Sequence, residues 1–305
     1  MQKYDCVIIV GPTASGKTKL SVELAKLLNT EIISADSQQF IRGLDIGTAK
    51  ITTNEMCGIK HHMIDVIDVG QEYTVSEYRE ECLKLISNLK SQGKIPIIAG
   101  GTGLYVNSLI YNYSFGNTDK NQEIRDYYFD LYNKYDAQYV HNILAELDPK
   151  SASEIHPNNV KRVIRAIEIA KLSSTKKSEQ VLEKNTEINP LIIGLNPSRQ
   201  TLYDNINKRA DMMIEQGLKN ETDKLFKQGY YTTNKITLPI SYSEWDKYYV
   251  QKMPIKCVVE QIKLDTKHYA KRQMTWFKKL ENVVWFNPET TPISEILNST
   301  MQLLK

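Results

Sequence analysis

The chain has 305 residues, 41% of them hydrophobic and 25% charged, and its formal net charge is +3 at pH 7. These values are typical of a globular protein with room for a core domain and an appendage, and no apolar stretch approaches the roughly 20 residues that a membrane-spanning helix needs. Because the four cysteines form no C-x-x-C pair and the first strand starts near residue 6, we expect a cytoplasmic protein with reduced thiols, no signal peptide and no membrane contact.

The first predicted elements are a buried strand at 6–10 and a helix at 19–28, with Leu20, Leu24, Leu27 and Leu28 on one face. Between them the sequence reads Gly11-Pro12-Thr13-Ala14-Ser15-Gly16-Lys17-Thr18, which matches the phosphate-loop pattern G-x-x-x-x-G-K-[ST] in its proper context. The glycines let backbone N–H groups face a ligand, and the helix N-terminus adds partial positive charge. Lys17 can reach a terminal phosphate and the Thr18 hydroxyl can bind Mg²⁺. The motif predicts binding of a di- or triphosphate.

Strands and helices continue to alternate over the first third of the chain. Apolar runs predict strands at 31–34, 62–67 and 95–99, and a helix at about 74–92 lies between the last two. This alternation predicts an α/β fold: a parallel, doubly wound sheet flanked by helices, whose ligands gather at the carboxyl ends of the strands.

The pattern changes at about residue 116, where the sequence becomes helical, polar and rich in tyrosine, with no predicted strand before residue 186. The core then resumes with a strand at 190–195, a helix opened by Asn196-Pro197 that reaches about residue 227, a helix from Pro254 to about residue 280 and a strand at 283–286. We therefore predict a core formed by 1–115 and 187–305, interrupted by a helical insertion at 116–186.

Polar residues beyond the phosphate loop extend the candidate site. Asp36 follows the strand at 31–34 and is a candidate magnesium ligand, general base or helix cap. Gln38 and Gln39 carry amide groups of the kind that read adenine edges. Thr102 offers a hydroxyl in a glycine-rich turn after the strand at 95–99, and Arg209 lies on the helix after 190–195, from which it could project toward the phosphate pocket.

Basic residues gather in two segments, 156–177 and 247–279, and in the second they alternate with aromatic residues such as Trp276 and Phe277. Basic and aromatic groups together suit a folded RNA, through phosphate neutralisation and base stacking. A solvated, lysine-rich helix face accounts for the same charges equally well. Charge alone therefore leaves both interpretations open.

Taken together, seven motifs strongly resemble the tRNA dimethylallyltransferase family. They are GPTASGKT (11–18), ISADSQQ (33–39), RGLDIGTAK (42–50), HHMID (61–65), GGTGLY (100–105), IHPNNVKRVIRAIE (155–168) and AKRQMTWF (270–277). They span nearly the whole chain in the family order. The resemblance implies a P-loop NTPase-like core. It also implies transfer of a dimethylallyl group from dimethylallyl diphosphate to N6 of the adenosine 3′ of a tRNA anticodon, and this adenosine would be flipped out of its stack.

The resemblance also implies roles for single residues and a cofactor. Asp36 would accept the N6 proton, while Thr13, Lys17 and Arg209 would stabilise the leaving diphosphate, which the whole loop 11–18 binds. Mg²⁺ is the implied cofactor, with Thr18 as its ligand, and the enzyme is expected to be a monomer. The implied tRNA contacts are Asp36, Ser37, Gln38, Gln39, Thr102, Arg125, Lys161, Arg162, Val163, Ile164 and Arg165.

Other interpretations of the phosphate loop remain. An isopentenyltransferase on free adenine nucleotides would not need most of the insertion, and a small-molecule kinase would bind ATP and need no RNA. The chain also departs from the family pattern at three positions. Ile41 stands where many members have Tyr, Ser241 where Gly is usual, and Lys267 where Arg is common. None of these removes a proposed catalytic group.

Overall fold

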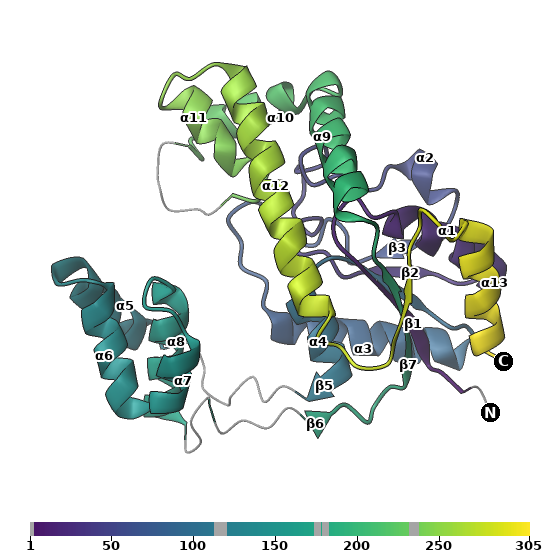
Figure 1. Cartoon of the computed structure of the whole chain (residues 1–305), viewed down its shortest axis with the longest axis horizontal. Helices are drawn as coiled ribbons and strands as arrows, with labels where there is room; N and C mark the ends of the chain where they lie inside the picture. The colour runs from purple at the N-terminus through teal and green to yellow at the C-terminus, as the bar shows by residue number, and fades with distance from the viewer. Residues whose placement is uncertain (1–2, 113–120, 174–177, 179–182, 232–237) are drawn as a thin grey trace. The chain divides into compact units, whose positions relative to one another are not determined.

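The computed structural model describes residues 3–112, 121–173, 178, 183–231 and 238–305. The chain divides into two compact units, one formed by Met1–Ile110 with Thr186–Lys305 and the other by Tyr111–Asn185 (Figure 1). The boundary expected at 115/116 lies outside the described residues. Among the described helices, none has both the length and the apolar character that a bilayer span requires.

The first unit is built on a six-stranded parallel sheet, which confirms the predicted α/β fold. In spatial order its strands are β3 (His61–His62), β2 (Ile32–Ser34), β4 (Ile97–Ala99), β1 (Cys6–Val10), β7 (Pro190–Leu195) and β8 (Val283–Phe286). β1 is central, with Ile8 opposite both Ile98 and Ile192. The strand expected at 62–67 is much shorter, because Met63 and Asp65 adopt left-handed backbone with φ of 61° and 55°.

Helices cover both faces of this sheet (Figure 1). On one face, α1 (Lys17–Leu28) and α13 (Ile293–Leu303) pack Leu20, Leu24 and Ile296 against the β1 side chains Val7 and Ile9. Leu27 was expected on the apolar face of α1, but it is 57% exposed because its position on the helix faces solvent.

The other helices of this unit include those that carry the site. They are α2 (Thr53–Met56), α3 (Val75–Ser91), α4 (Gly103–Ile110), α9 (Arg199–Glu215), α10 (Leu218–Lys227), η2 (Ser243–Trp245), α11 (Asp246–Tyr249) and α12 (Ile255–Phe277). Long α12 lies against both α9 and α4. The single helix expected from Asn196 to about 227 is two helices: Ser198 caps α9, and Gly217, with φ of 99°, separates it from α10.

The second unit is a small helical bundle with its own core. Its elements are β5 (Tyr111–Asn112), α5 (Gln122–Lys134), α6 (Ala137–Leu147), α7 (Pro149–Glu154), α8 (Val160–Leu172) and β6 (Glu183–Lys184). Tyr128, Leu144 and Ile167 are among its core residues. The antiparallel pair β5–β6 was not predicted, since a two-residue strand is too short to produce a periodic pattern.

Candidate active site

Three neighbouring strands end at one edge of the sheet and bring the main motifs together. The phosphate loop follows β1, Asp36 follows β2 and the glycine-rich turn follows β4, which lies between them. Close packing requires glycine at two of these strand ends. A Cβ on Gly11, whose φ is 152°, would lie 2.7 Å from the Leu195 carbonyl oxygen, and a Cβ on Gly100 would lie 2.2 Å from the backbone of Ala35. The order of the strands therefore places the predicted motifs side by side.

The phosphate loop leads directly into α1, with Gly16 as the N-cap in left-handed backbone at φ 94°. Its Ser15 hydroxyl is buried and has no hydrogen-bond partner among the described residues. Lys17 donates a hydrogen bond of 2.7 Å from Nζ to the Pro12 carbonyl oxygen. Burial lowers the pKa of Lys17 to about 8, partly offset by the charge of Asp36. The loop therefore offers an anion site with a poorly solvated ammonium group.

Asp36, Arg209 and Thr13 form the charged centre of the site. Arg209 donates from Nη1 to the Thr13 hydroxyl at 3.3 Å. Burial raises the pKa of Asp36, opposed by the Gln38 N–H, which donates to Asp36 Oδ1 at 3.1 Å, and by the charges of Lys17 and Arg209. A turn, not a helix, follows Asp36 at residues 37–40, so Asp36 does not cap a helix.

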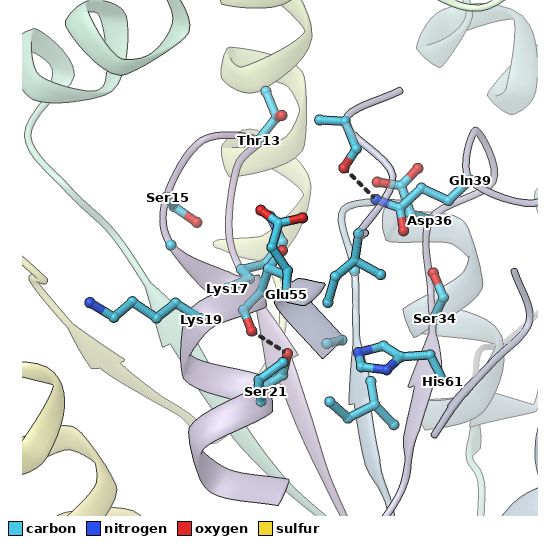
Figure 2. A pocket seen from close by; sticks show the side chains of 18 of the residues that line it. Thr13, Ser15, Lys17, Lys19, Ser21, Ser34, Asp36, Gln39, Glu55 and His61 are labelled. Atoms are coloured by element: carbon cyan, nitrogen blue, oxygen red, sulfur yellow. Dashed lines mark hydrogen bonds between the residues drawn. The ribbon is translucent and has the colours of Figure 1, made fainter. Parts of the chain in front are cut away.

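Two cavities meet at these residues. The larger, of about 450 Å³, follows the phosphate loop and α1, and Figure 2 shows Thr13, Lys17, Asp36 and Gln39 around it. The smaller, of about 40 Å³, lies against α9 and α12 and is lined by Gln38 among others. Five residues line both cavities: Thr13, Asp36, Thr48, Ala49 and Arg209. The predicted catalytic residues thus lie where the two spaces join.

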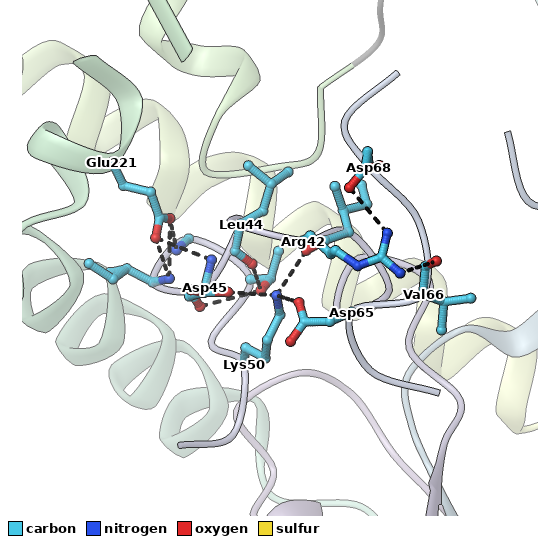
Figure 3. Close-up of polar contacts among 12 residues, drawn as sticks. Arg42, Leu44, Asp45, Lys50, Asp65, Val66, Asp68 and Glu221 are labelled. Carbon is cyan, nitrogen blue, oxygen red and sulfur yellow. Dashed lines mark hydrogen bonds and ion pairs between the residues drawn. The ribbon is translucent and has the colours of Figure 1, made fainter. Parts of the chain in front are cut away.

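The loop that carries Thr48 and Ala49 is fixed by a carboxylate from α10 (Figure 3). Glu221 accepts hydrogen bonds from the backbone N–H groups of Asp45 and Ile46 at 3.2 Å and of Gly47 at 3.4 Å. The Tyr242 hydroxyl donates to Glu221 and accepts from the Gly47 N–H at 3.0 Å. Sequence reasoning missed Glu221, because a single acid on an amphipathic helix carries no local signal.

Helix α12 supplies further residues that were not predicted. Tyr269 and Thr266 line the smaller cavity, and Gln273 bonds to the phosphate loop. Gln273 lies within the motif AKRQMTWF, which the sequence distinguishes only by its family resemblance. The predicted contacts Ser37 and Thr102 lie together, with the Ser37 N–H donating to Thr102 Oγ1 at 2.9 Å.

The expected RNA contacts of the helical unit have different environments. Lys161 and Arg162 are exposed at the start of α8. Arg125 and Arg165 instead bond to Glu168, a fully buried carboxylate, at 2.9 and 2.6 Å. Val163 and Ile164 are at most 1% exposed and belong to the core of this unit, so their side chains are not free to contact RNA.

Comparison with known proteins shows which family the chain resembles in sequence and fold. Residues 39–280 match the family model described as IPP transferase. The chain belongs to this family. A tRNA dimethylallyltransferase of Acetivibrio thermocellus is 47% identical over 93% of the chain and 91% of the relative, and that of Staphylococcus haemolyticus is 46% identical over 98% and 92%. The full-length tRNA isopentenylpyrophosphate transferase of Bacillus halodurans superposes with a TM-score of 0.73 at 40% identity, covering 99% of this chain and 97% of that one.

A eukaryotic dimethylallyltransferase acting on tRNA is also similar, with a TM-score of 0.81 and 27% identity over 98% of this chain and 80% of that chain.

The three residues that depart from the family pattern have different surroundings in this IPP transferase. Ile41 packs beside the α10–α12 core, and the Lys267 ammonium lies 5.5 Å from the Tyr203 ring centre. Ser241 is buried beside the smaller cavity in left-handed backbone at φ 75°, a conformation in which glycine is unstrained.

Proposed function

We propose that the chain transfers the dimethylallyl group of dimethylallyl diphosphate to N6 of the adenosine 3′ of a tRNA anticodon and releases diphosphate. The observation that carries the proposal is the position of Thr13, Asp36 and Arg209, which line both cavities at their junction. We assign the larger cavity to the dimethylallyl diphosphate and the smaller one to the target adenosine, with the Asp36 carboxylate and the Arg209 guanidinium where they join. The relatives named tRNA dimethylallyltransferase support the same chemistry.

The donor half rests on the phosphate loop. Its N–H groups and Lys17 would hold the diphosphate, and the buried Ser15 hydroxyl is a further donor without a protein partner among the described residues. The Thr18 hydroxyl and diphosphate oxygens are hard ligands that fit Mg²⁺. Mg²⁺ bound there by Thr18 would supply charge neutralisation of the diphosphate. Among the described residues no group of three His, Cys, Asp or Glu forms a separate metal cluster.

The chemical step moves one group and one proton. The N6 lone pair attacks C1 of the dimethylallyl group, the C1–O bond breaks, and its electron pair leaves with the diphosphate. Asp36 accepts the N6 proton, and its raised pKa makes this carboxylate a stronger base than an ordinary aspartate. Arg209 and Thr13, joined at 3.3 Å, would stabilise the charge that develops on the leaving oxygen.

The RNA half is assigned to both units. Ser37, Gln38, Gln39 and Thr102 would contact the target base and its neighbours. In the helical unit, the exposed Lys161 and Arg162 of α8 are the groups available for phosphates. We assign the enzyme to the cytoplasm, where it would act as a monomer.

The test is label transfer from radiolabelled dimethylallyl diphosphate with Mg²⁺ and three acceptors. These are an anticodon stem-loop with adenosine 3′ of the anticodon, the same stem-loop with guanosine there, and AMP. We expect label only in the adenosine stem-loop, with loss in Asp36→Ala and retention in Asp204→Ala, a matched change at an exposed position of α9. Label in AMP would instead indicate a nucleotide-directed enzyme, and ATP-dependent phosphoryl transfer without prenylation would indicate a kinase.

A further inference from the structure

One buried side chain joins the two loops that form the site. Gln273 of α12 is 5% exposed. Its Oε1 accepts a hydrogen bond from the Thr13 N–H at 2.8 Å, and its Nε2 donates to the Gly101 carbonyl oxygen at 2.9 Å. Both partners are backbone groups with fixed polarity, so the orientation of the amide follows from them. The bridge therefore needs an acceptor at one end and a donor at the other.

Each end of this bridge reaches a different part of the chemistry. Thr13 belongs to the phosphate loop, and its hydroxyl meets Arg209 at 3.3 Å. Gly101 precedes Thr102, whose hydroxyl accepts from the N–H of Ser37, the residue after Asp36. A Cβ on Gly101 would lie 2.2 Å from Gln273 Nε2 and 3.8 Å from Asp36 Oδ2, so this turn, the amide and the carboxylate are packed together.

We propose that Gln273 is a positioning residue that sets the location of the diphosphate loop at Thr13 relative to the base Asp36. The proposal rests on the proposed function, because it assigns leaving-group and proton-transfer roles to these two residues. A displacement of about 1 Å between reacting groups lowers a rate by roughly 10²-fold. Substrate binding depends instead on many groups of the loop and on Lys17, whereas Gln273 bonds to the loop at the Thr13 N–H. Loss of the bridge should therefore lower kcat more than it raises KM.

The first test replaces the amide by groups that differ only in hydrogen bonding. Gln273→Met removes both bonds, and Gln273→Glu keeps an acceptor for Thr13 but, when ionised, has no proton for Gly101. We expect both variants to lose roughly 10²-fold in kcat, with KM for dimethylallyl diphosphate changed by less than about threefold. As the pH is lowered, protonation of the introduced carboxylate restores the donor, so the kcat of Gln273→Glu relative to wild type should rise, while that of Gln273→Met should not.

The control is the same pair of substitutions at Gln261, on α12 more than three turns earlier, where the side chain bonds to Lys247 and Asp265 instead of the site. These variants should keep wild-type kcat. If Gln273→Met keeps wild-type kcat, or if Gln273→Glu shows no relative recovery at low pH, the positioning role is wrong. Wild-type enzyme is assayed in parallel, and absence of transfer by wild type would overturn the proposed function instead.

A second variant acts on the same bridge from its other side. Gly101→Ala places a methyl group against Gln273 Nε2 and should displace the amide, so it should reproduce the kcat loss of Gln273→Met. Since both changes break one bridge, the double variant should be little slower than either single variant. Losses that multiply in the double variant would show that Gly101 and Gln273 act separately and would overturn the proposal.

Discussion

The ammonium group of Lys17 donates its hydrogen bond to the carbonyl oxygen of Pro12, five residues earlier in the same loop, at 2.7 Å. Burial lowers the pKa of Lys17 to about 8, so the free protein loses this proton as the pH rises through 8. A bound diphosphate stabilises the charged form and raises that pKa. We therefore predict that affinity for dimethylallyl diphosphate falls above pH 8 and that binding near pH 9 takes up a proton.

Calorimetry at pH 9 in buffers of different ionisation enthalpy measures this proton uptake directly. Lys17→Met should lower the affinity strongly and abolish the uptake, whereas Lys26→Met, a matched change at an exposed position in the last turn of α1, should alter neither. The same proton uptake in Lys17→Met would assign it to another group, such as the diphosphate itself.

Asp36 gives a prediction at the acidic end of the pH range. Burial raises its pKa above the ordinary 3.8, and the base must be ionised to accept the N6 proton. The rate should therefore fall as the pH drops through this raised pKa, and Asp36→Asn should lose about 10²- to 10⁴-fold and show no acidic limb. Single-turnover rates followed from neutral pH down toward the ordinary pKa of 3.8 provide the measurement. An acidic limb that persists unchanged in Asp36→Asn would contradict the base role.

The sequence could predict the sheet and the residues at its strand ends because both depend on local patterns. The apolar runs of β1 and β7 and the phosphate loop are contiguous signals, and parallel order places Asp36 opposite the loop. The position of Arg209 on the helix after 190–195 made it a candidate, but only the family resemblance distinguished it from a surface arginine. Gln273 and Glu221 could not be predicted, because the backbone groups that they bind lie 172 or more residues away in the chain.

The sequence also could not predict which charged side chains of the helical unit are buried. The basic pattern indicates free cations at Arg125 and Arg165, yet both face Glu168, which lies on the same helix as Arg165 and has no exposed surface. A segment that is basic by composition can therefore hold internal ion pairs, and only the packing of α5 on α8 separates these from the free cations.

Glu221 leads to a prediction about the loop that lines both cavities. Replacing Glu221 by Ala leaves the N–H groups of Asp45, Ile46 and Gly47 without this acceptor, and we expect a loss of about 1–3 kcal/mol in the free energy of unfolding. Urea denaturation measures the change, and KM for the donor should rise because Thr48 and Ala49 follow in the same loop. Glu215→Ala, at an exposed position of α9, should change neither quantity.

The two kinds of arginine in the helical unit should respond differently to substitution. Arg162→Ala removes an exposed charge, so it should weaken binding of a fluorescent stem-loop without affecting stability. It should also reduce the slope of log K for binding against log[salt] by about 1. Arg125→Ala removes one of the two arginines that pair with a buried carboxylate, so it should lower stability, by less than the roughly 3–5 kcal/mol of a fully unpaired buried charge because Arg165 remains. A variant Arg125→Ala that is fully stable but binds RNA weakly would assign Arg125 to the RNA surface.

Ser241 provides a test of backbone strain beside the smaller cavity. A non-glycine residue in left-handed backbone costs about 1–2 kcal/mol, and Ser241 adopts φ of 75° while buried. Glycine removes that strain but loses about 0.5–1 kcal/mol through its greater freedom in the unfolded chain. We therefore expect Ser241→Gly to leave stability unchanged or raise it by up to about 1.5 kcal/mol. Ser241→Val, which is β-branched, should lower stability by more than about 1 kcal/mol. Urea midpoints compare the three proteins, and a clearly destabilised glycine variant would mean that the hydroxyl, and not the backbone, decides this position.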